Sequence, residues 1–317
     1  MRWNRFLLFG GVCLLLLTSC GDSDDGDSAA NDLDGVSITV GSKDFTEQLV
    51  LGEIISQAMT ERGAEVVRKL DTGDTTQTRA ALEGGDIDTY FEYNSTGWIV
   101  HLGNSDPESD GEALTEMVAD ADSANGVTWV GRSTFNNTYG FAATPEIRQA
   151  NLATRENFGE AFDLADMADY LKDNDDAVVC VEQDFLERAD GMVLFEEATE
   201  YEVPDSQIVV VDTIADVYEE VADGACDFGE VFTTDGLLES LGLTPVVDPG
   251  VFFVYNVSLT IDSDVYNQAP DAFDDVVGDV LAPLSQPVIT KLNQRVAEGE
   301  PVEDVAADFL DSFDVNP

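Results

Sequence analysis

One lysine stands where a strand is expected to give way to a helix. Residues 41–48 read GSKDFTEQ, and Lys43 within them is one of only four lysines in the chain. A helix N-terminus presents free backbone N–H groups and a partial positive charge, to which Lys43 would add a full charge. We therefore expect Lys43 to contact an anion. The alternative is an exposed lysine that pairs with a surface aspartate.

Four aromatic residues fall at expected turns rather than at the spacing of a core. Tyr93 lies in EYNSTG, Tyr139 follows NNT, Phe232 precedes TTDG and Tyr255 follows FFV. Aromatic faces arranged as a box attract a quaternary ammonium ion by cation–π interaction, which contributes about 2 kcal/mol or more per desolvated contact. Taken singly, each ring could instead serve core or rim packing, and the sequence alone does not bring the four together.

Arrangements that would support catalysis are missing from the sequence. The only histidine, His101, has no neighbouring cysteine or second histidine with which to form a metal site. No G-x-S-x-G elbow, P-loop or G-x-G-x-x-G after a strand is present. Pairs of carboxylates are expected by chance among 65 acidic residues. We therefore expect no enzyme, no metal site and no cofactor.

The elements that must position these residues alternate between strand-like and helical stretches. Strand-like runs are expected at 36–40, 64–70, 87–91, 127–130, 177–181, 207–211, 226–231 and 251–260. Helices are expected at 45–62, 75–83, 160–172, 213–223 and three places near the C-terminus. Asp44 and Glu47 resemble a capping box at the start of the first helix, and Gly63 resembles its stop. This alternation predicts an α/β fold with largely parallel sheets.

A weak internal repeat indicates two units of similar build. Residues 85–97 (GDIDTYFEYNSTG) and 224–236 (GACDFGEVFTTDG) share an Asp at the fourth position, an aromatic residue at the ninth and a Gly at the last. Each aromatic, Tyr93 or Phe232, would then lie just past the C-terminal end of a strand, the edge at which open α/β sheets bind ligands. Two such edges that face each other would form a cleft.

The charge of the chain excludes one class of partner. With 14 basic and 65 acidic residues, the formal net charge is −51, and such a field repels nucleic acid. An apolar fraction of 44% is too high for a disordered chain, so the carboxylates are expected on a folded surface. Salt screens the repulsion among them, which favours a salt-adapted source.

The N-terminus predicts export and a lipid anchor. Residues 1–19 contain two arginines followed by a short apolar run, which is typical of a signal peptide and too short to span a membrane. The sequence LTSC then resembles a lipobox with Cys20 as the lipidated residue; the alternative is an ordinary cleavage site with an incidental cysteine. Residues 20–35, rich in Asp, Ser and Gly, are expected to form a flexible acidic tether. Their acidic spacing only loosely resembles a calcium loop.

Two further cysteines, Cys180 and Cys226, lie in strand-like runs of a chain expected in an oxidising compartment. They form either a disulfide or two buried free thiols, and the sequence does not decide between these.

Two stretches carry a family resemblance. Residues 41–51 (GSKDFTEQLVL) and 79–97 (RAALEGGDIDTYFEYNSTG) closely resemble the substrate-binding components of glycine betaine/carnitine/choline ABC transporters, the ProX/OpuAC-like quaternary-ammonium binding proteins. NNTY at 136–139, FLERADG at 185–191 and FTTDG at 232–236 continue the likeness in order. The resemblance implies a periplasmic-binding-protein type II fold, with two α/β lobes and a hinged cleft between them. Lobe 1 would comprise 36–136 plus 251–317, and lobe 2 would comprise 137–250.

The resemblance also implies roles for individual residues. It assigns an aromatic cage to Tyr93, Tyr139, Phe232 and Tyr255, and contacts with a ligand carboxylate to Lys43, Thr96 and Arg188. Phe232 departs from the tyrosine usual in the family, which keeps the π face but removes the hydroxyl. Tyr255 lacks the Pro-Pro that usually precedes it, and Arg188 matches through the Ala-Asp-Gly that follows it.

These observations together predict an extracytoplasmic, membrane-anchored and monomeric receptor for an ABC importer. It would capture glycine betaine or a related quaternary-ammonium osmoprotectant and deliver it to permease and ATPase subunits. An alternative is a lipoprotein of the same fold for choline or another small cationic or zwitterionic solute such as an amino acid, which an acidic residue facing an ammonium group would signal. A surface enzyme or a structural lipoprotein is a third possibility, and the single histidine opposes the enzyme.

Overall fold

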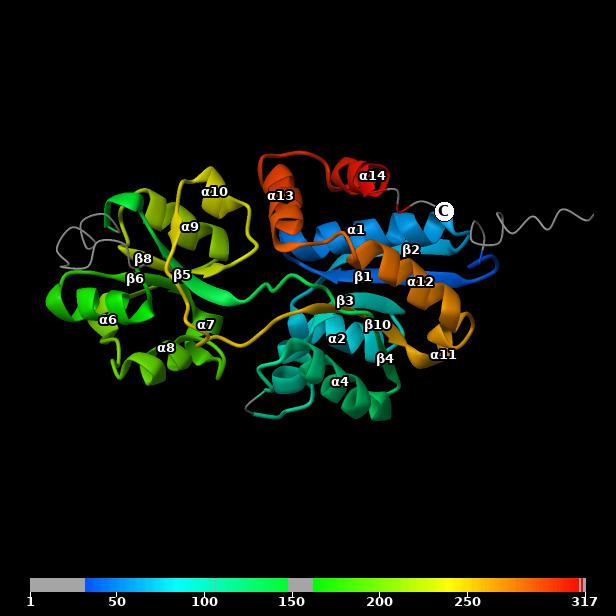
Figure 1. Ribbon diagram of the computed structural model, residues 1–317, viewed down its shortest axis with the longest axis horizontal. Helices are drawn as coiled ribbons and strands as arrows, with labels where there is room; N and C mark the ends of the chain where they lie inside the picture. Colours follow the sequence, from blue (N-terminus) through cyan, green and yellow to red (C-terminus); the bar gives the residue numbers. More distant parts are fainter. Residues whose placement is uncertain (1–31, 106, 148–161, 314, 316–317) are drawn as a thin grey trace, which may run out of the picture.

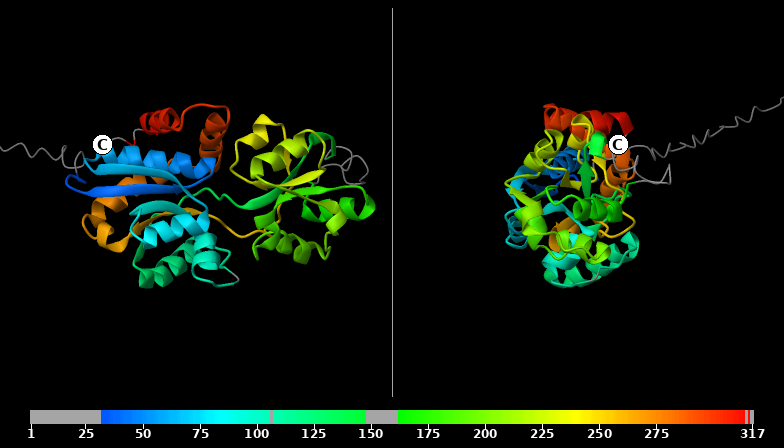
Figure 2. Two further views of the ribbon diagram at one scale, coloured as in Figure 1. Left: turned by 180° about the vertical axis from the view of Figure 1, so that it is seen from behind. Right: turned by 90° about the vertical axis from the view of Figure 1, so that its left-hand side faces the viewer.

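The computed structural model describes residues 32–105, 107–147, 162–313 and 315. The chain forms two α/β lobes that lie side by side along the long axis of the molecule (Figure 1). Figure 2 shows two chain segments that run from one lobe to the other. The two-lobed α/β fold predicted from the sequence is therefore confirmed.

The first lobe is built on a five-stranded sheet with the order β2-β1-β3-β10-β4. Its strands are β1 (Ser37–Lys43), β2 (Glu65–Gly73), β3 (Thr89–Tyr93), β4 (Val127–Val130) and β10 (Val257–Asp262). β1 is parallel to β2 and β3, whereas β10 is antiparallel to β3 and β4. The sheet is therefore mixed and not largely parallel as the sequence predicted, because β10 returns from the other lobe.

Helices cover both faces of this sheet. They are α1 (Thr46–Glu61), α2 (Thr75–Glu83), α3 (Asn94–Thr96), a π-helical turn (Gly97–His101), α4 (Gly111–Asp122), a 3-10 turn (Ser123–Asn125), α11 (Ser263–Tyr266), α12 (Pro270–Leu281), α13 (Gln286–Ala297) and α14 (Val302–Phe313). α1 packs against α12, α13 and α14 on one face. On the other face, Leu82 of α2 and Val118 of α4 share a smaller core with Trp129 of β4.

The second lobe repeats this plan with the strand order β7-β6-β8-β5-β9. Its strands are β5 (Tyr139–Ala143), β6 (Val179–Glu182), β7 (Ile208–Val211), β8 (Phe228–Phe232) and β9 (Thr244–Pro245). Its helices are α6 (Leu164–Asp173), α7 (Gln183–Glu187), α8 (Met192–Thr199), a 3-10 turn (Asp205–Gln207), α9 (Ile214–Ala222) and α10 (Leu237–Ser240). The structure joins Cys180 and Cys226 in a disulfide, with 5.8 Å between their Cα atoms.

The two crossovers between the lobes run beside each other and are hydrogen-bonded. One leads from β4 to β5 and the other from β9 to β10. The Asn137 backbone N–H donates to the Tyr255 carbonyl at 3.1 Å, and the Thr138 hydroxyl donates to the Phe253 carbonyl at 2.7 Å. The division that we propose, 36–136 plus 251–317 against 137–250, places both lobe boundaries within these crossovers.

Helix α13 adds a further contact between the lobes. A Cβ atom at Gly236, in the loop after β8, would lie 2.2 Å from the backbone N and Cα of Gln294, so only glycine allows this approach. The Gln286 side chain donates to the carbonyl oxygens of Asn136 and Thr233 at 3.2 and 3.3 Å. The loop after β8 is therefore held against the first lobe.

The internal repeat corresponds to equivalent strands. Tyr93 is the last residue of β3 and Phe232 the last residue of β8, and each strand is the central one of its sheet. The aromatic residues thus end the strands rather than follow them.

Several local predictions were wrong. Tyr139, expected at a turn, begins β5, and residues 251–256, expected to be strand, belong to the second crossover. The N-cap of α1 is Phe45, which makes no side-chain capping bond, so the capping box of Asp44 and Glu47 does not form. Its failure has a tertiary cause, because the Glu47 side chain is buried among partners from elsewhere in the chain.

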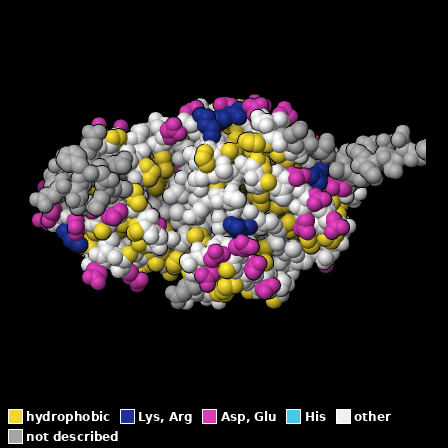
Figure 3. Space-filling model, in the orientation of Figure 1, with side chains coloured by type: hydrophobic (Ala, Val, Ile, Leu, Met, Phe, Trp, Pro, Cys, Tyr) yellow, Lys and Arg dark blue, Asp and Glu magenta, His cyan; other side chains and the backbone are white. Residues whose placement is uncertain are grey.

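The expected signal peptide at 1–19, the expected lipidation site Cys20 and residues 20–31 of the expected tether lie outside the described residues. Residues 32–35, which were expected to belong to the flexible tether, are instead packed on the first lobe, because Leu33 is fully buried and Asp32 pairs with Arg62. Among the residues that the structure describes, no helix is both long and apolar enough to cross a membrane. On the face drawn in Figure 3, acidic side chains are spread over the surface and basic ones are few.

Candidate functional site

A cavity of about 580 Å³ is lined by residues of both lobes and of the crossovers. Its lining includes all seven residues to which the family resemblance assigns ligand contacts: Lys43, Tyr93, Thr96, Tyr139, Arg188, Phe232 and Tyr255. Residues far apart in the chain are brought together because strand ends meet there. β1 ends at Lys43, β3 at Tyr93 and β8 at Phe232, whereas β5 begins at Tyr139.

The aromatic side chains of the cavity contact one another. The Tyr139 ring centroid lies 5.3 Å from that of Phe232 and 5.9 Å from that of Tyr255. A fifth ring, Phe45, also lines the cavity, and sequence reasoning assigned it only to the apolar face of α1. The sequence signal that could have revealed it is its place in the GSKDFTEQ motif, two residues after Lys43.

Lys43 is fixed by a buried carboxylate. Its Nζ lies 2.6 Å from Glu92 Oε1, and the two side chains are 3% and 0% exposed. Its ammonium group also lies 5.1 Å from the centroid of the Tyr93 ring. An ammonium group has three N–H donors, so pairing with Glu92 leaves donors available toward the cavity that Lys43 lines.

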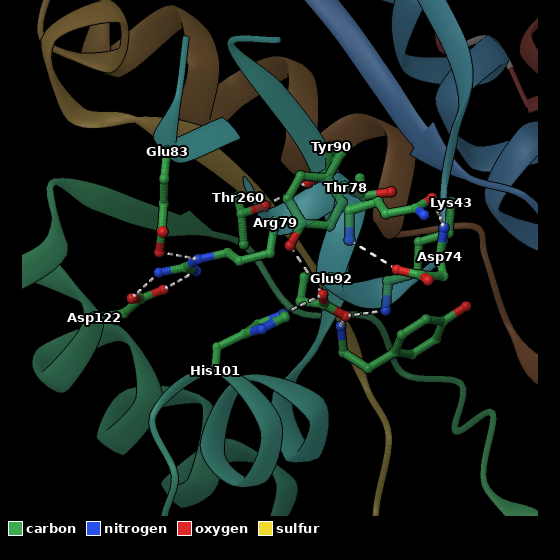
Figure 4. A network of polar contacts seen from close by, with 12 residues as sticks. Lys43, Asp74, Thr78, Arg79, Glu83, Tyr90, Glu92, His101, Asp122 and Thr260 are labelled. Atoms are coloured by element: carbon green, nitrogen blue, oxygen red, sulfur yellow. Dashed lines mark hydrogen bonds and ion pairs between the residues drawn. The ribbon is translucent and has the colours of Figure 1, made fainter. Parts of the chain in front are cut away.

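Glu92 is the centre of a buried polar network (Figure 4). Besides Lys43, it accepts hydrogen bonds from the Tyr90 hydroxyl at 2.9 Å and the Tyr93 backbone N–H at 2.7 Å, and His101 Nε2 lies 2.7 Å from its Oε2. Burial alone would raise the pKa of Glu92, but Lys43 and His101 outweigh it and lower that pKa to about 2. Glu92 is therefore a carboxylate at neutral pH.

Arg188 is held in a comparable way on the second lobe. Its Nε and Nη2 donate to Asp190 at 2.8 and 2.5 Å, and the Tyr255 hydroxyl donates to the same carboxylate. The guanidinium carbon lies 5.7 Å from the Tyr139 ring centroid. Because guanidinium has five N–H donors, Arg188 keeps donors for a ligand after pairing with Asp190.

Glu47 is the polar residue that sequence reasoning missed most completely. Its carboxylate is buried and accepts four hydrogen bonds, from the hydroxyls of Tyr93 (2.7 Å) and Thr234 (2.5 Å) and the amides of Asn137 and Asn293 (3.0 Å each). Burial raises the pKa of Glu47, and these hydrogen bonds oppose that rise. The donors come from the first lobe (Tyr93 of β3 and Asn293 of α13), the first crossover and the second lobe, so Glu47 joins three parts of the fold.

The cavity also has an acidic side. Asp44, Asp74, Glu182 and Asp184 line it alongside the two basic residues. Burial, with a smaller contribution from Asp184, raises the pKa of Glu182 to about 7. Within the described residues, no group of three or more His, Cys, Asp or Glu side chains is placed to hold a metal ion.

The arrangement suits a ligand with a bulky cation at one end and an anion at the other. Aromatic faces stabilise a weakly hydrated cation, and Lys43 and Arg188 offer charge-assisted donors to an anion. Thr96, a buried residue of α3, lines the same cavity. Lys43 belongs to the first lobe and Arg188 to the second, so one anion could contact both lobes.

Comparison with protein families gives a match over most of the chain. The model of the substrate binding domain of the ABC-type glycine betaine transport system matches residues 36–312. The chain is 28% identical over 281 residues to the glycine betaine-binding protein YehZ of Escherichia coli (strain K12), covering 86% of this chain and 89% of the relative. It is 29% identical over 281 residues to the glycine-betaine-binding protein of Pseudomonas aeruginosa, covering 86% of each.

Solved structures show the same fold. Apo YehZ of Escherichia coli superposes with a TM-score of 0.67 at 27% identity, covering 87% of this chain and 98% of the other. A glycine betaine/carnitine/choline ABC transporter structure reaches a TM-score of 0.73 at 18% identity, covering 88% of this chain and all of the other.

Proposed function

The chain belongs to the family of substrate-binding domains of ABC-type glycine betaine transport systems, and on this premise we propose that it captures glycine betaine or a closely related betaine for an ABC importer. The proposal is carried by one observation. Aromatic rings and two basic side chains, contributed by both lobes, line the same cavity.

The quaternary ammonium group of the ligand would bind among Tyr93, Tyr139, Phe232 and Tyr255. Such a cation is weakly hydrated, so its transfer to an aromatic site costs little and gains cation–π attraction. Phe232 supplies a ring face without a hydroxyl. The contact between the cation and Phe232 would therefore depend on the face of the ring and not on a hydrogen bond.

The ligand carboxylate would contact Lys43, Thr96 and Arg188. Both basic residues are already oriented by buried acidic partners, so little side-chain freedom is lost when they bind an anion. Because they belong to different lobes, a carboxylate bound to both stabilises the closed arrangement. Closure is favoured only by the difference in ligand affinity between the open and closed states.

The setting that we propose is the outer face of the cell membrane. Lipidation at Cys20 would anchor the protein there, and the acidic segment that follows Cys20 would tether it to the membrane that holds the permease and ATPase subunits. A monomer is sufficient for this role, because the cavity is complete within one chain.

Choline is the second candidate, and the acidic side of the cavity favours it. Asp74 and Asp184 add negative charge that attracts a cation without a carboxylate. Choline, however, would leave Lys43 and Arg188 without an anion to bind. The same acidic side chains would also meet the ammonium group of an amino acid.

Isothermal titration in high salt with glycine betaine, choline and an unmethylated amino acid, glycine, tests the proposal. We expect glycine betaine to bind more tightly than choline, and glycine to bind far more weakly than both. Absence of binding by glycine betaine and choline to a folded protein would refute the proposal, and stronger binding of choline would favour the second candidate.

The Thr96→Val variant tests the carboxylate contact separately, because it removes one hydroxyl and leaves both ion pairs intact. We expect the affinity for glycine betaine to fall by about tenfold, the lower end of the range for one hydrogen bond to a charged group. The affinity for choline should stay within about twofold. Equal losses for the two ligands would show that Thr96 does not contact the carboxylate.

A further inference from the structure

Five aromatic rings form a continuous row around the cavity. In order they are Tyr93, Phe45, Phe232, Tyr139 and Tyr255, and all five line the cavity. Successive ring centroids are 6.3, 6.0, 5.3 and 5.9 Å apart. Phe45 is nearly parallel to both of its neighbours, at interplanar angles of 20° and 23°. It therefore connects a ring of the first lobe, Tyr93, with one of the second, Phe232.

Phe45 stands at a position where another residue type is usual. It is the N-cap of α1, with an extended backbone, and no side-chain hydrogen bond caps the helix. Ser, Thr, Asp and Asn are preferred there because their side chains accept a free backbone N–H of the first turn. A phenylalanine forgoes that bond, so helix capping does not account for the residue. Its ring instead forms part of the cavity wall.

The segment that carries Phe45 is fixed on both sides. Two residues earlier, Lys43 pairs with Glu92, and two residues later, Glu47 accepts hydrogen bonds from Tyr93 of the first lobe and Thr234 of the second. The ring is therefore held in place by polar contacts of its own chain neighbours. A ring fixed before the ligand arrives loses little conformational entropy on binding.

We propose that Phe45 is a fifth ring of the cation cage, which contacts the quaternary ammonium group together with the four rings assigned to that role. This inference rests on the proposed function. Phe45 has neither a hydrogen-bond donor nor an acceptor in its side chain, so it recognises only the cation. Its loss should therefore weaken the binding of glycine betaine and choline by the same factor.

The test uses Phe45→Leu, which keeps much of the apolar volume but removes the π face, and Phe45→Tyr, which restores a ring. Phe273→Leu is the matched control, since Phe273 is fully buried in the first lobe and does not line the cavity. Affinities for glycine betaine and choline are measured by isothermal titration on the full chain in high salt, and the midpoint of thermal unfolding is recorded for each variant.

We expect Phe45→Leu to lose about thirtyfold in affinity for both ligands, the factor that corresponds to one desolvated cation–π contact. Phe45→Tyr should stay within about threefold of the original chain, and Phe273→Leu should unfold at a lower temperature with unchanged affinity. If Phe45→Leu does not fold, Phe45→Met removes the ring in its place.

Two results would overturn the inference. The first is an affinity within about twofold of the original when the ring is removed. The second is a loss that Phe273→Leu reproduces, because the effect would then be one of general destabilisation. Failure of the proposed function is distinguishable, since the unaltered chain would then bind neither ligand.

Discussion

Glu92 and Glu47 are two buried carboxylates that contact the same tyrosine and are stabilised in opposite ways. Glu92 receives the backbone N–H of Tyr93 and is paired with Lys43 and His101. Glu47 receives the Tyr93 hydroxyl together with three other neutral donors, and none of these four partners is a cation. The pKa of Glu92 is lowered, to about 2, whereas burial raises that of Glu47.

Under the proposed function, the two carboxylates would act on opposite ends of a zwitterionic ligand. Glu92 and Lys43 largely cancel each other's charge, so the pair would mainly orient the ammonium donors of Lys43 for an anion. Glu47 in its ionised form keeps a net negative charge at the phenolic end of Tyr93, where it favours a cation near that ring. A protein with a net charge of −51 thus does not need a basic pocket to hold a carboxylate-bearing ligand. Local pairing decides where each charge can be bound.

The substitution with the largest expected effect is Lys43→Met, which removes the cation that compensates the charge of Glu92. It leaves Glu92 buried without its lysine partner, so we expect the free energy of unfolding at pH 7 to fall by about 3–5 kcal/mol. Denaturant titration measures this change.

The double variant Lys43→Met/Glu92→Gln should recover part of the loss, since removing both charges removes the unpaired one. Lys291→Met is the control, because the Lys291 ammonium bonds to Gln294 at the exposed surface. A loss from Lys43→Met no larger than that of the control would contradict the view that Glu92 depends on its cation.

The next prediction concerns the opposite pH dependence of the two carboxylates. The pKa of Glu92 falls from 4.5 to about 2 in the folded protein, so its contribution is present above about pH 4.5 and is lost as the pH falls toward 2. This shift corresponds to about 3 kcal/mol. For Glu47 the folded pKa is raised above 4.5, so its contribution is fully present below pH 4.5 and declines as the pH rises.

Denaturant titrations of the original chain, Glu92→Gln and Glu47→Gln from pH 2 to pH 8 measure these contributions. The stability difference between the original chain and Glu92→Gln should rise with pH, and the corresponding difference for Glu47→Gln should fall. Taking differences cancels the titration of the many surface carboxylates. Slopes of the same sign would contradict the assignment of the two environments.

The sequence predicted the fold well where the signals are local. The expected bounds of α2 (75–83) and β4 (127–130) match the structure, and Gly63 follows α1 with a φ of +93°. These elements depend on capping, hydrophobic pattern and turn residues within one short window. Strand β3 was placed two residues too early: the expected apolar run ended before the polar residue Glu92, which the structure buries inside the strand.

The candidate site was predicted through the family resemblance more than through physical reasoning on the residues. The ring residues and Lys43 could be identified one at a time, but their partners could not. Glu92 is 49 residues from Lys43 in sequence, and Thr234 is 187 residues from Glu47. Glu47 illustrates the reason: its spacing from Asp44 is that of a local capping box, and only the packing of α1 against α13 and the second lobe reveals its actual partners.

The smallest expected effect comes from removing one tyrosine hydroxyl that donates to each of the two carboxylates. Tyr93→Phe deletes one of the four donors to Glu47, and Tyr90→Phe deletes the hydroxyl that donates to Glu92. Both tyrosines are buried, so the two variants lose a similar group. A buried carboxylate without cationic partners relies more on each donor, so we expect Tyr93→Phe to cost about 2 kcal/mol and Tyr90→Phe about 1 kcal/mol. Urea titration at pH 7 measures the free energy of unfolding of both variants. A larger loss from Tyr90→Phe than from Tyr93→Phe would show that a neutral donor stabilises a carboxylate with an ion pair at least as much as one without.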